Sequence, residues 1–127
     1  MHSKKASLVL ATSLLALTVA AQTRIVPREA RALLLAGKGA VLMDVRTAEE
    51  FQELRIPGAI LLPYDKIDQK SAATAIPSKE STVIVYCRSG RRSAIAAATL
   101  ATLGYKRVLD LGAIGDWPYE TANGTVK

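Results

Sequence analysis

The chain has 127 residues, a length typical of one domain, and half of its residues are hydrophobic. It carries 17 basic and 11 acidic residues, for a net charge of +6, while aromatic residues make up only 5%. Because no block of five or six like charges occurs and aromatic side chains are sparse, the composition argues against a nucleic-acid-binding protein.

The first 21 residues have the pattern of an export signal. Lys4 and Lys5 precede an uncharged apolar run over residues 6–21, which ends in small residues. A membrane-spanning helix needs about 20 apolar residues, whereas this run has 16, so retention as an anchor is the less favoured alternative. We expect residues 1–21 to be a cleaved signal peptide and residues 22–127 to form one periplasmic domain without stable membrane association.

Short apolar segments alternate with helical patterns along the rest of the chain. The expected strands cover residues 24–26, 40–45, 59–62, 82–86 and 108–110, and the expected helices cover residues 28–36, 47–54, 65–75 and 93–103. Thr47 is a good N-cap, with Glu49 and Glu50 in the first turn of its helix. This alternation predicts an α/β fold with a mostly parallel central sheet and helices on both faces.

The only cysteine, Cys87, follows the clearest of these strands. Ligands of parallel sheets bind at the carboxyl ends of strands, which is where this residue is expected. A tight turn over residues 87–92, hereafter the Cys87 loop, directs backbone N–H groups at a common centre, and Gly90 permits the backbone conformation that this requires. These groups and the nearby arginines favour the thiolate, so the pattern predicts a nucleophile rather than an inert buried thiol.

The other residues of the Cys87 loop are predicted to bind substrate. Ser89 and Gly90 are expected to supply backbone N–H groups, while Arg88 and Arg91 attract anions to the pocket mouth. Arg92 has two open roles: it holds an anionic donor, or it pairs with a carboxylate and braces the loop. The loop therefore predicts a site for a small anion.

The segment from Cys87 to Ser93 reads Cys-Arg-Ser-Gly-Arg-Arg-Ser and resembles the active loop Cys-x-x-Gly-x-Arg-Ser of rhodanese domains. Three more segments resemble the same family, in its order and spacing: residues 42–59, 103–108 and 111–117. The resemblance implies a single rhodanese-like domain of the small exported kind. The sequence departs from the family at Arg55, where many members have His, and at Ala113, where they have a second Gly.

The resemblance implies a thiosulfate sulfurtransferase that needs no metal or other cofactor. A small anionic donor such as thiosulfate would pass its outer sulfur to Cys87, and the persulfide would pass it to cyanide, a thiol or a protein acceptor. Asp44 and Arg46 would brace the site, with Arg46 paired to Glu50. An exposed pair at that strand end could instead touch substrate, and this alternative stays open.

Two other functions stay open from the sequence. One is a persulfide carrier or redox-responsive binding module with little turnover of its own. The other is a phosphatase or arsenate reductase on the same fold. Phosphatases that resemble rhodaneses place their arginine one position later than Arg92, which is five positions after Cys87. The shorter loop favours sulfur over phosphate chemistry.

Overall fold

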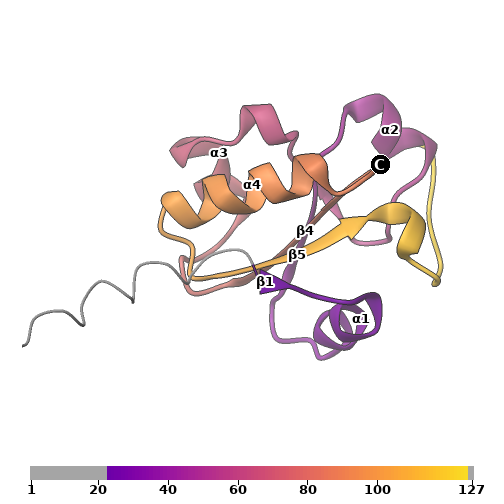
Figure 1. Ribbon diagram of the computed structural model, residues 1–127, viewed down its shortest axis with the longest axis horizontal. Coiled ribbons are helices and arrows are strands. Elements are labelled where there is room, and N and C mark those ends of the chain that lie inside the picture. Colours follow the sequence, from indigo (N-terminus) through magenta and orange to yellow (C-terminus); the bar gives the residue numbers. More distant parts are fainter. Residues whose placement is uncertain (1–22, 126–127) are drawn as a thin grey trace, which may run out of the picture.

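The computed structural model describes residues 23–125 (Figure 1). Within that range, five strands form one sheet in the order β1-β5-β4-β2-β3, and each neighbouring pair is parallel. The strands are β1 (Thr23–Arg24), β2 (Val41–Asp44), β3 (Ile60–Leu61), β4 (Thr82–Cys87) and β5 (Arg107–Ala113). The predicted parallel α/β sheet is confirmed. The predicted signal peptide lies outside the described residues.

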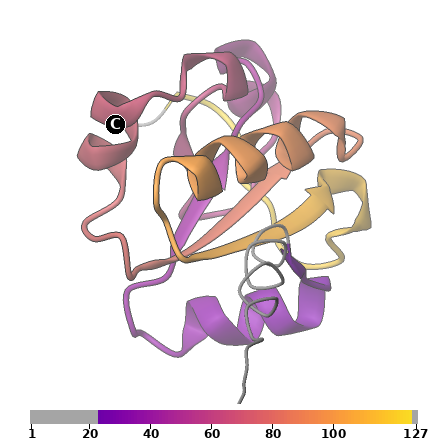
Figure 2. The same ribbon diagram turned by 60° about the vertical axis from the view of Figure 1, so that its left-hand side comes forward.

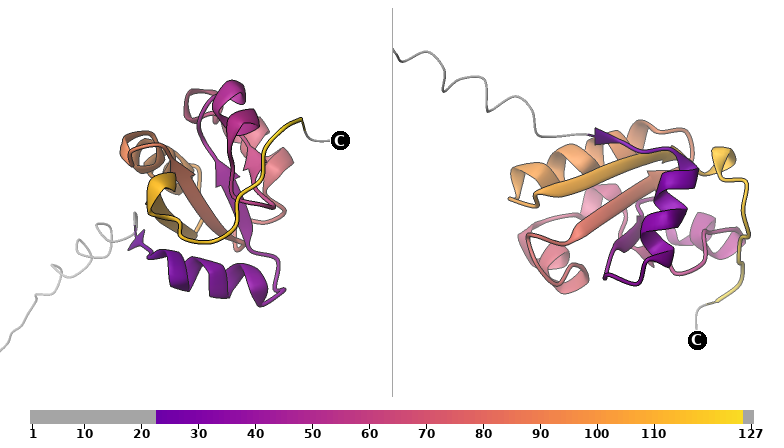
Figure 3. Two further views of the ribbon diagram at one scale, coloured as in Figure 1. Left: turned by 90° about the vertical axis from the view of Figure 1, so that its right-hand side faces the viewer. Right: turned by 90° about the horizontal axis from the view of Figure 1, so that it is seen from below.

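Helices cover both faces of the sheet. They are α1 (Pro27–Leu35), α2 (Ala48–Glu53), α3 (Gln69–Ala75) and α4 (Arg91–Thr102), with 3₁₀ turns η2 (Tyr64–Lys66) and η3 (Ile114–Asp116). Helices α3 and α4 lie on one side of the sheet (Figure 2). Their side chains, among them Ala72 and Leu100, form one core with β2, β4 and β5. Helix α1 lies on the opposite side (Figure 3). Its Ala30 packs there in a second core. No helix within residues 23–125 is both long and apolar enough to span a membrane.

Two expected elements differ from the structure for local reasons. The helix expected over residues 65–75 is split into η2 and α3, because Asp68 and Ser71 form a capping box that starts a new helix. The last strand, expected over residues 108–110, continues to Ala113. Asp110 is buried within it rather than ending it.

Strand β4 is central, so the ends of its neighbours flank its last residue. Tyr86 lies beside Asp44 of β2, and an irregularity after Val85 aligns Cys87 with Ala113 of β5. Parallel strands end at the same edge of a sheet. The carboxyl ends of β2, β4 and β5 therefore meet around Cys87.

Candidate active site

The Cys87 side chain is fully buried at the end of β4 and faces α4. Its Sγ accepts two backbone hydrogen bonds, from the N–H of Gly90 at 3.0 Å and from the N–H of Ser93 at 3.3 Å. Two N–H groups directed at one sulfur offer stabilisation to a negative charge on that atom. The structure therefore contains a turn with backbone N–H groups directed at one centre, as the sequence predicts around Cys87.

Gly90 makes this turn possible. Its φ of 101° lies in the left-handed region, and it is the N-cap of α4. Helix α4 consequently begins at Arg91, two residues earlier than expected from the sequence, and the Ser93 N–H belongs to its first turn. Ser89 is exposed beside these donors. The sequence analysis did not select Ser93, although the last serine of the motif was a signal that could have identified it.

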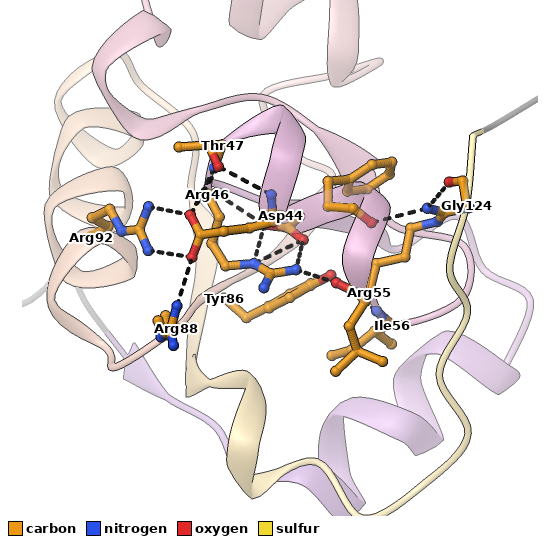
Figure 4. Close-up of polar contacts among 12 residues, drawn as sticks. Asp44, Arg46, Thr47, Arg55, Ile56, Tyr86, Arg88, Arg92 and Gly124 are labelled. Carbon is orange, nitrogen blue, oxygen red and sulfur yellow. Dashed lines mark hydrogen bonds and ion pairs between the residues drawn. The ribbon is translucent and has the colours of Figure 1, made fainter.

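Arg92 takes the bracing role of its two predicted alternatives. Its Nη1 and Nη2 donate to the two carboxylate oxygens of Glu50, at 2.9 and 3.0 Å (Figure 4). Arg88 approaches the same carboxylate at 3.9 Å, although 76% of its side chain is exposed. The hydrogen bonds from Arg92, with further bonds from Thr47, lower the pKa of Glu50 to about 2, and the Glu50 carboxylate raises the pKa of Arg92. Glu50 thus holds the Arg92 guanidinium by two hydrogen bonds, while Arg88 lies near the same carboxylate.

Glu50 also takes part in the N-terminal cap of its own helix, α2. Its side chain accepts from the N–H of Thr47 at 3.2 Å, and its N–H donates to the Thr47 Oγ1 at 3.2 Å. This capping box confirms the N-cap predicted at Thr47. One carboxylate therefore fixes the start of α2 and ties it to the start of α4, which is 42 residues away in the chain.

Asp44 and Arg46 form a separate pair at the end of β2. The Arg46 Nη2 lies 2.7 Å from the Asp44 Oδ2, and the two side chains are 5% and 0% exposed. Although burial opposes the charged form, the hydrogen bonds and charge of Asp44 raise the pKa of Arg46. The expected pairing of Arg46 with Glu50 is therefore wrong, because Asp44 is nearer on the same strand end and Glu50 is taken by Arg92. Burial of the pair favours bracing over substrate contact.

Two tyrosines support the site without having been selected from the sequence. The Tyr86 hydroxyl accepts a hydrogen bond from the N–H of Ile56 at 3.1 Å, and burial, followed by the charge of Asp44, raises the pKa of Tyr86 above its ordinary value. The guanidinium of Arg91 lies over the ring of Tyr64, 5.9 Å from its centroid. Long-range contacts of this kind leave no pattern in a single sequence.

Comparison with known proteins assigns the chain to a family. The family model described as "Rhodanese-like domain" matches residues 26–117. "Thiosulfate sulfurtransferase PspE" of Escherichia coli is 39% identical over 74 residues, covering 58% of this chain and 70% of that protein. "Putative sulfur carrier protein YrkF" of Bacillus subtilis is 30% identical over 81 residues, covering 63% of this chain but only 42% of that protein.

A solved structure supports the same assignment. "Rhodanese with anions from E. coli" superposes with a TM-score of 0.63 at 35% identity, covering 67% of this chain and 99% of that chain. The similarity in sequence and structure supports sulfur transfer, which requires a sulfur donor and a sulfur acceptor.

Proposed function

Since the chain belongs to the rhodanese-like domain family and is a sulfurtransferase, we propose that Cys87 is its nucleophile and thiosulfate its donor. The observation that carries this proposal is the Cys87 Sγ at the end of the central strand, facing the N–H groups of Gly90 and Ser93. The same two donors serve a thiolate before transfer and an anionic persulfide after it. Neither step requires a histidine base.

The reaction consists of two displacements at sulfur. In the first, the Cys87 thiolate attacks the outer sulfur of thiosulfate, the S–S bond of thiosulfate breaks, and sulfite leaves with the electron pair. In the second, cyanide or a thiolate attacks the outer sulfur of the Cys87 persulfide. Thiocyanate or a new persulfide leaves, and the Cys87 thiolate returns. Dividing one difficult transfer into two easier ones is the benefit of a covalent intermediate.

The arginines of the Cys87 loop have different tasks in this proposal. Arg88 and Arg91 are exposed and raise the local concentration of anionic donors at the entrance to the Cys87 site. Arg92 is held by Glu50 and positions the start of α4, whose first-turn N–H groups face the sulfur. Because Arg92 is already paired with Glu50, the Cys87 loop offers less positive charge to a phosphate dianion. This supports sulfur chemistry over the phosphatase or arsenate reductase alternative.

A sulfur carrier is the second candidate, favoured by the similarity to the Bacillus subtilis protein with that name. A carrier would accept sulfur on Cys87 and transfer it to a partner without turning over on small acceptors.

We also propose that residues 22–127 are exported to the periplasm, a proposal that rests on the apolar leader in the sequence.

The test is thiocyanate formation from thiosulfate and cyanide by the wild type and by Cys87→Ser. We expect turnover by the wild type and only the uncatalysed rate from the variant, since the variant lacks the sulfur that carries the transferred atom. Intact-mass measurement after thiosulfate alone should show an adduct of about 32 Da, one sulfur atom, on the wild type only. A stable adduct without turnover would instead favour the carrier, and equal activity of both proteins would contradict the role of Cys87.

A further inference from the structure

We propose that Arg24 is a specificity-determining residue, which makes the Cys87 site favour doubly charged sulfur donors over singly charged ones. This inference rests on the proposed function and narrows the donor class of its first step. Arg24 belongs to β1, which lies at the edge of the sheet beside β5 (Figure 1). The charge that it adds therefore comes from outside the Cys87 loop.

The guanidinium of Arg24 lies against Gly112, near the end of β5. A Cβ atom placed on Gly112 would be 3.0 Å from the Arg24 Nη2 and 3.6 Å from its Cζ, so the bare glycine backbone admits the group. Gly112 in turn lies beside Gly90, because a Cβ atom on Gly90 would be 3.9 Å from the Gly112 Cα. The Gly90 N–H donates to the Cys87 Sγ. Gly112 and Gly90 thus connect the guanidinium to the reacting sulfur through close contacts.

Arg24 occupies this place instead of pairing with the carboxylate beside it. Arg24 and Asp110 are partners in the β1–β5 register, and Asp110 is 3% exposed. The Asp110 Oδ1 accepts no hydrogen bond from residues 23–125, and no carboxylate in that range lies within 4.0 Å of the Arg24 guanidinium. The guanidinium is therefore displaced from Asp110 toward Gly112, two residues further along β5 and nearer to the Cys87 loop.

The positive charge of Arg24 is available to a donor, whereas that of Arg92 is held by Glu50. Coulomb attraction is proportional to the charge of the donor. Thiosulfate carries two negative charges, and an organic thiosulfonate such as methanethiosulfonate carries one while offering the same outer sulfur to a thiolate. Arg24 should therefore contribute about twice as much binding free energy for thiosulfate as for methanethiosulfonate.

The experiment measures thiocyanate formation at saturating cyanide with thiosulfate or methanethiosulfonate as the donor. With either donor the Cys87 thiolate attacks the outer sulfur and the S–S bond breaks. Sulfite or methanesulfinate leaves with the electron pair, so the same persulfide forms. Arg24→Met should lower kcat/KM about tenfold for thiosulfate and about threefold for methanethiosulfonate, because the interaction energy scales with the charge of the donor. Arg24→Lys keeps the charge and should recover most of both values.

The control is Arg107→Met, which removes one positive charge from an exposed residue at the start of β5. Arg107 precedes Gly112 by five residues, about 16 Å along a strand, a distance at which salt screens an exposed charge. Arg107→Met should therefore leave kcat/KM unchanged for both donors.

Three results overturn the inference. Arg24→Met lowers kcat/KM equally for both donors or not at all for thiosulfate, Arg24→Lys is as impaired as Arg24→Met, or Arg107→Met causes the same loss. Turnover by the wild type would preserve the proposed function in each of these cases. Absence of thiocyanate from the wild type with both donors would refute the proposed function itself.

Discussion

Two carboxylate–guanidinium pairs lie near Cys87, and they differ in burial and in the part of the chain that they join. Asp44 and Arg46 are two residues apart at the end of β2 and are 0% and 5% exposed. Glu50 and Arg92 join α2 to α4 and are 17% and 19% exposed. Both pairs have good geometry, but water reaches only the second.

The difference separates a structural pair from one that adjusts the site. A buried pair cannot release either partner without leaving a charge in the core, so Asp44 and Arg46 fix the end of β2 and, through a bond from Arg46 to the Leu54 carbonyl, the end of α2. A partly exposed pair can exchange its partners with water or a ligand. Glu50 therefore controls how much positive charge the Cys87 loop presents.

The largest expected effect comes from breaking the buried pair. Asp44→Ala leaves Arg46 charged and unpaired in the core, which should lower the free energy of unfolding by about 3–5 kcal/mol. Arg92→Met, at the exposed pair, should lower it by about 1 kcal/mol or less. Urea denaturation of the two variants and the wild type measures both values.

A double variant tests whether the loss in Asp44→Ala comes from the unpaired charge. Asp44→Leu combined with Arg46→Met removes both charges at once and should recover most of the stability, because no buried ion remains. If Arg92→Met lowers the free energy of unfolding as much as Asp44→Ala does, the two ion pairs do not differ in their contribution to stability.

This contrast also marks what could be predicted from the sequence. The alternation of apolar and helical segments was enough for the parallel sheet, and a β-branched run followed by a lone cysteine was enough to locate the candidate site. Thr47 and Glu50 carry a capping signal that is local, three residues apart. Patterns of this kind depend on residues close together in the chain, so they can be predicted from the sequence alone.

The ion-pair partners of Arg46 and Arg92 could not be predicted from the sequence in this way. Arg92 and Glu50 are 42 residues apart, and the sequence alone does not show which carboxylate α2 presents to α4. The mistaken pairing of Arg46 with Glu50 has the same origin. The sequence predicts a last strand over residues 108–110, whereas β5 continues to Ala113 because tertiary packing buries Asp110 within it.

A smaller effect is expected when Glu50 loses its charge. Glu50→Gln frees Arg92 and Arg88 to bind anions, while a glutamine at this position can still complete the capping box with Thr47. Inhibition by inorganic phosphate should become about tenfold stronger, corresponding to about 1.4 kcal/mol of added charge-assisted bonding. Steady-state inhibition constants with thiosulfate and cyanide measure this directly.

Glu49→Gln is the matched control, since it removes one negative charge from the same helical turn without touching an arginine of the loop. An equal gain in phosphate inhibition in both variants would mean that net charge alone is responsible. In that case Glu50 would have no specific role in holding the positive charge of the Cys87 loop.

The smallest expected effect is the pH dependence of the exposed pair. The pKa of Glu50 is lowered from an ordinary 4.5 to about 2 in the folded protein, chiefly by its bonds with Arg92. A group whose pKa is lower in the folded state contributes its full stabilisation above the unfolded value and loses it as the pH falls toward the folded value. The stability advantage of the wild type over Glu50→Gln should therefore be constant above pH 4.5 and shrink as the pH falls toward about 2. Urea denaturation of both proteins across that range measures the difference, in which the titration of other carboxylates largely cancels. An advantage that stays constant throughout would show that Glu50 does not draw its stabilisation from the ionised pair with Arg92.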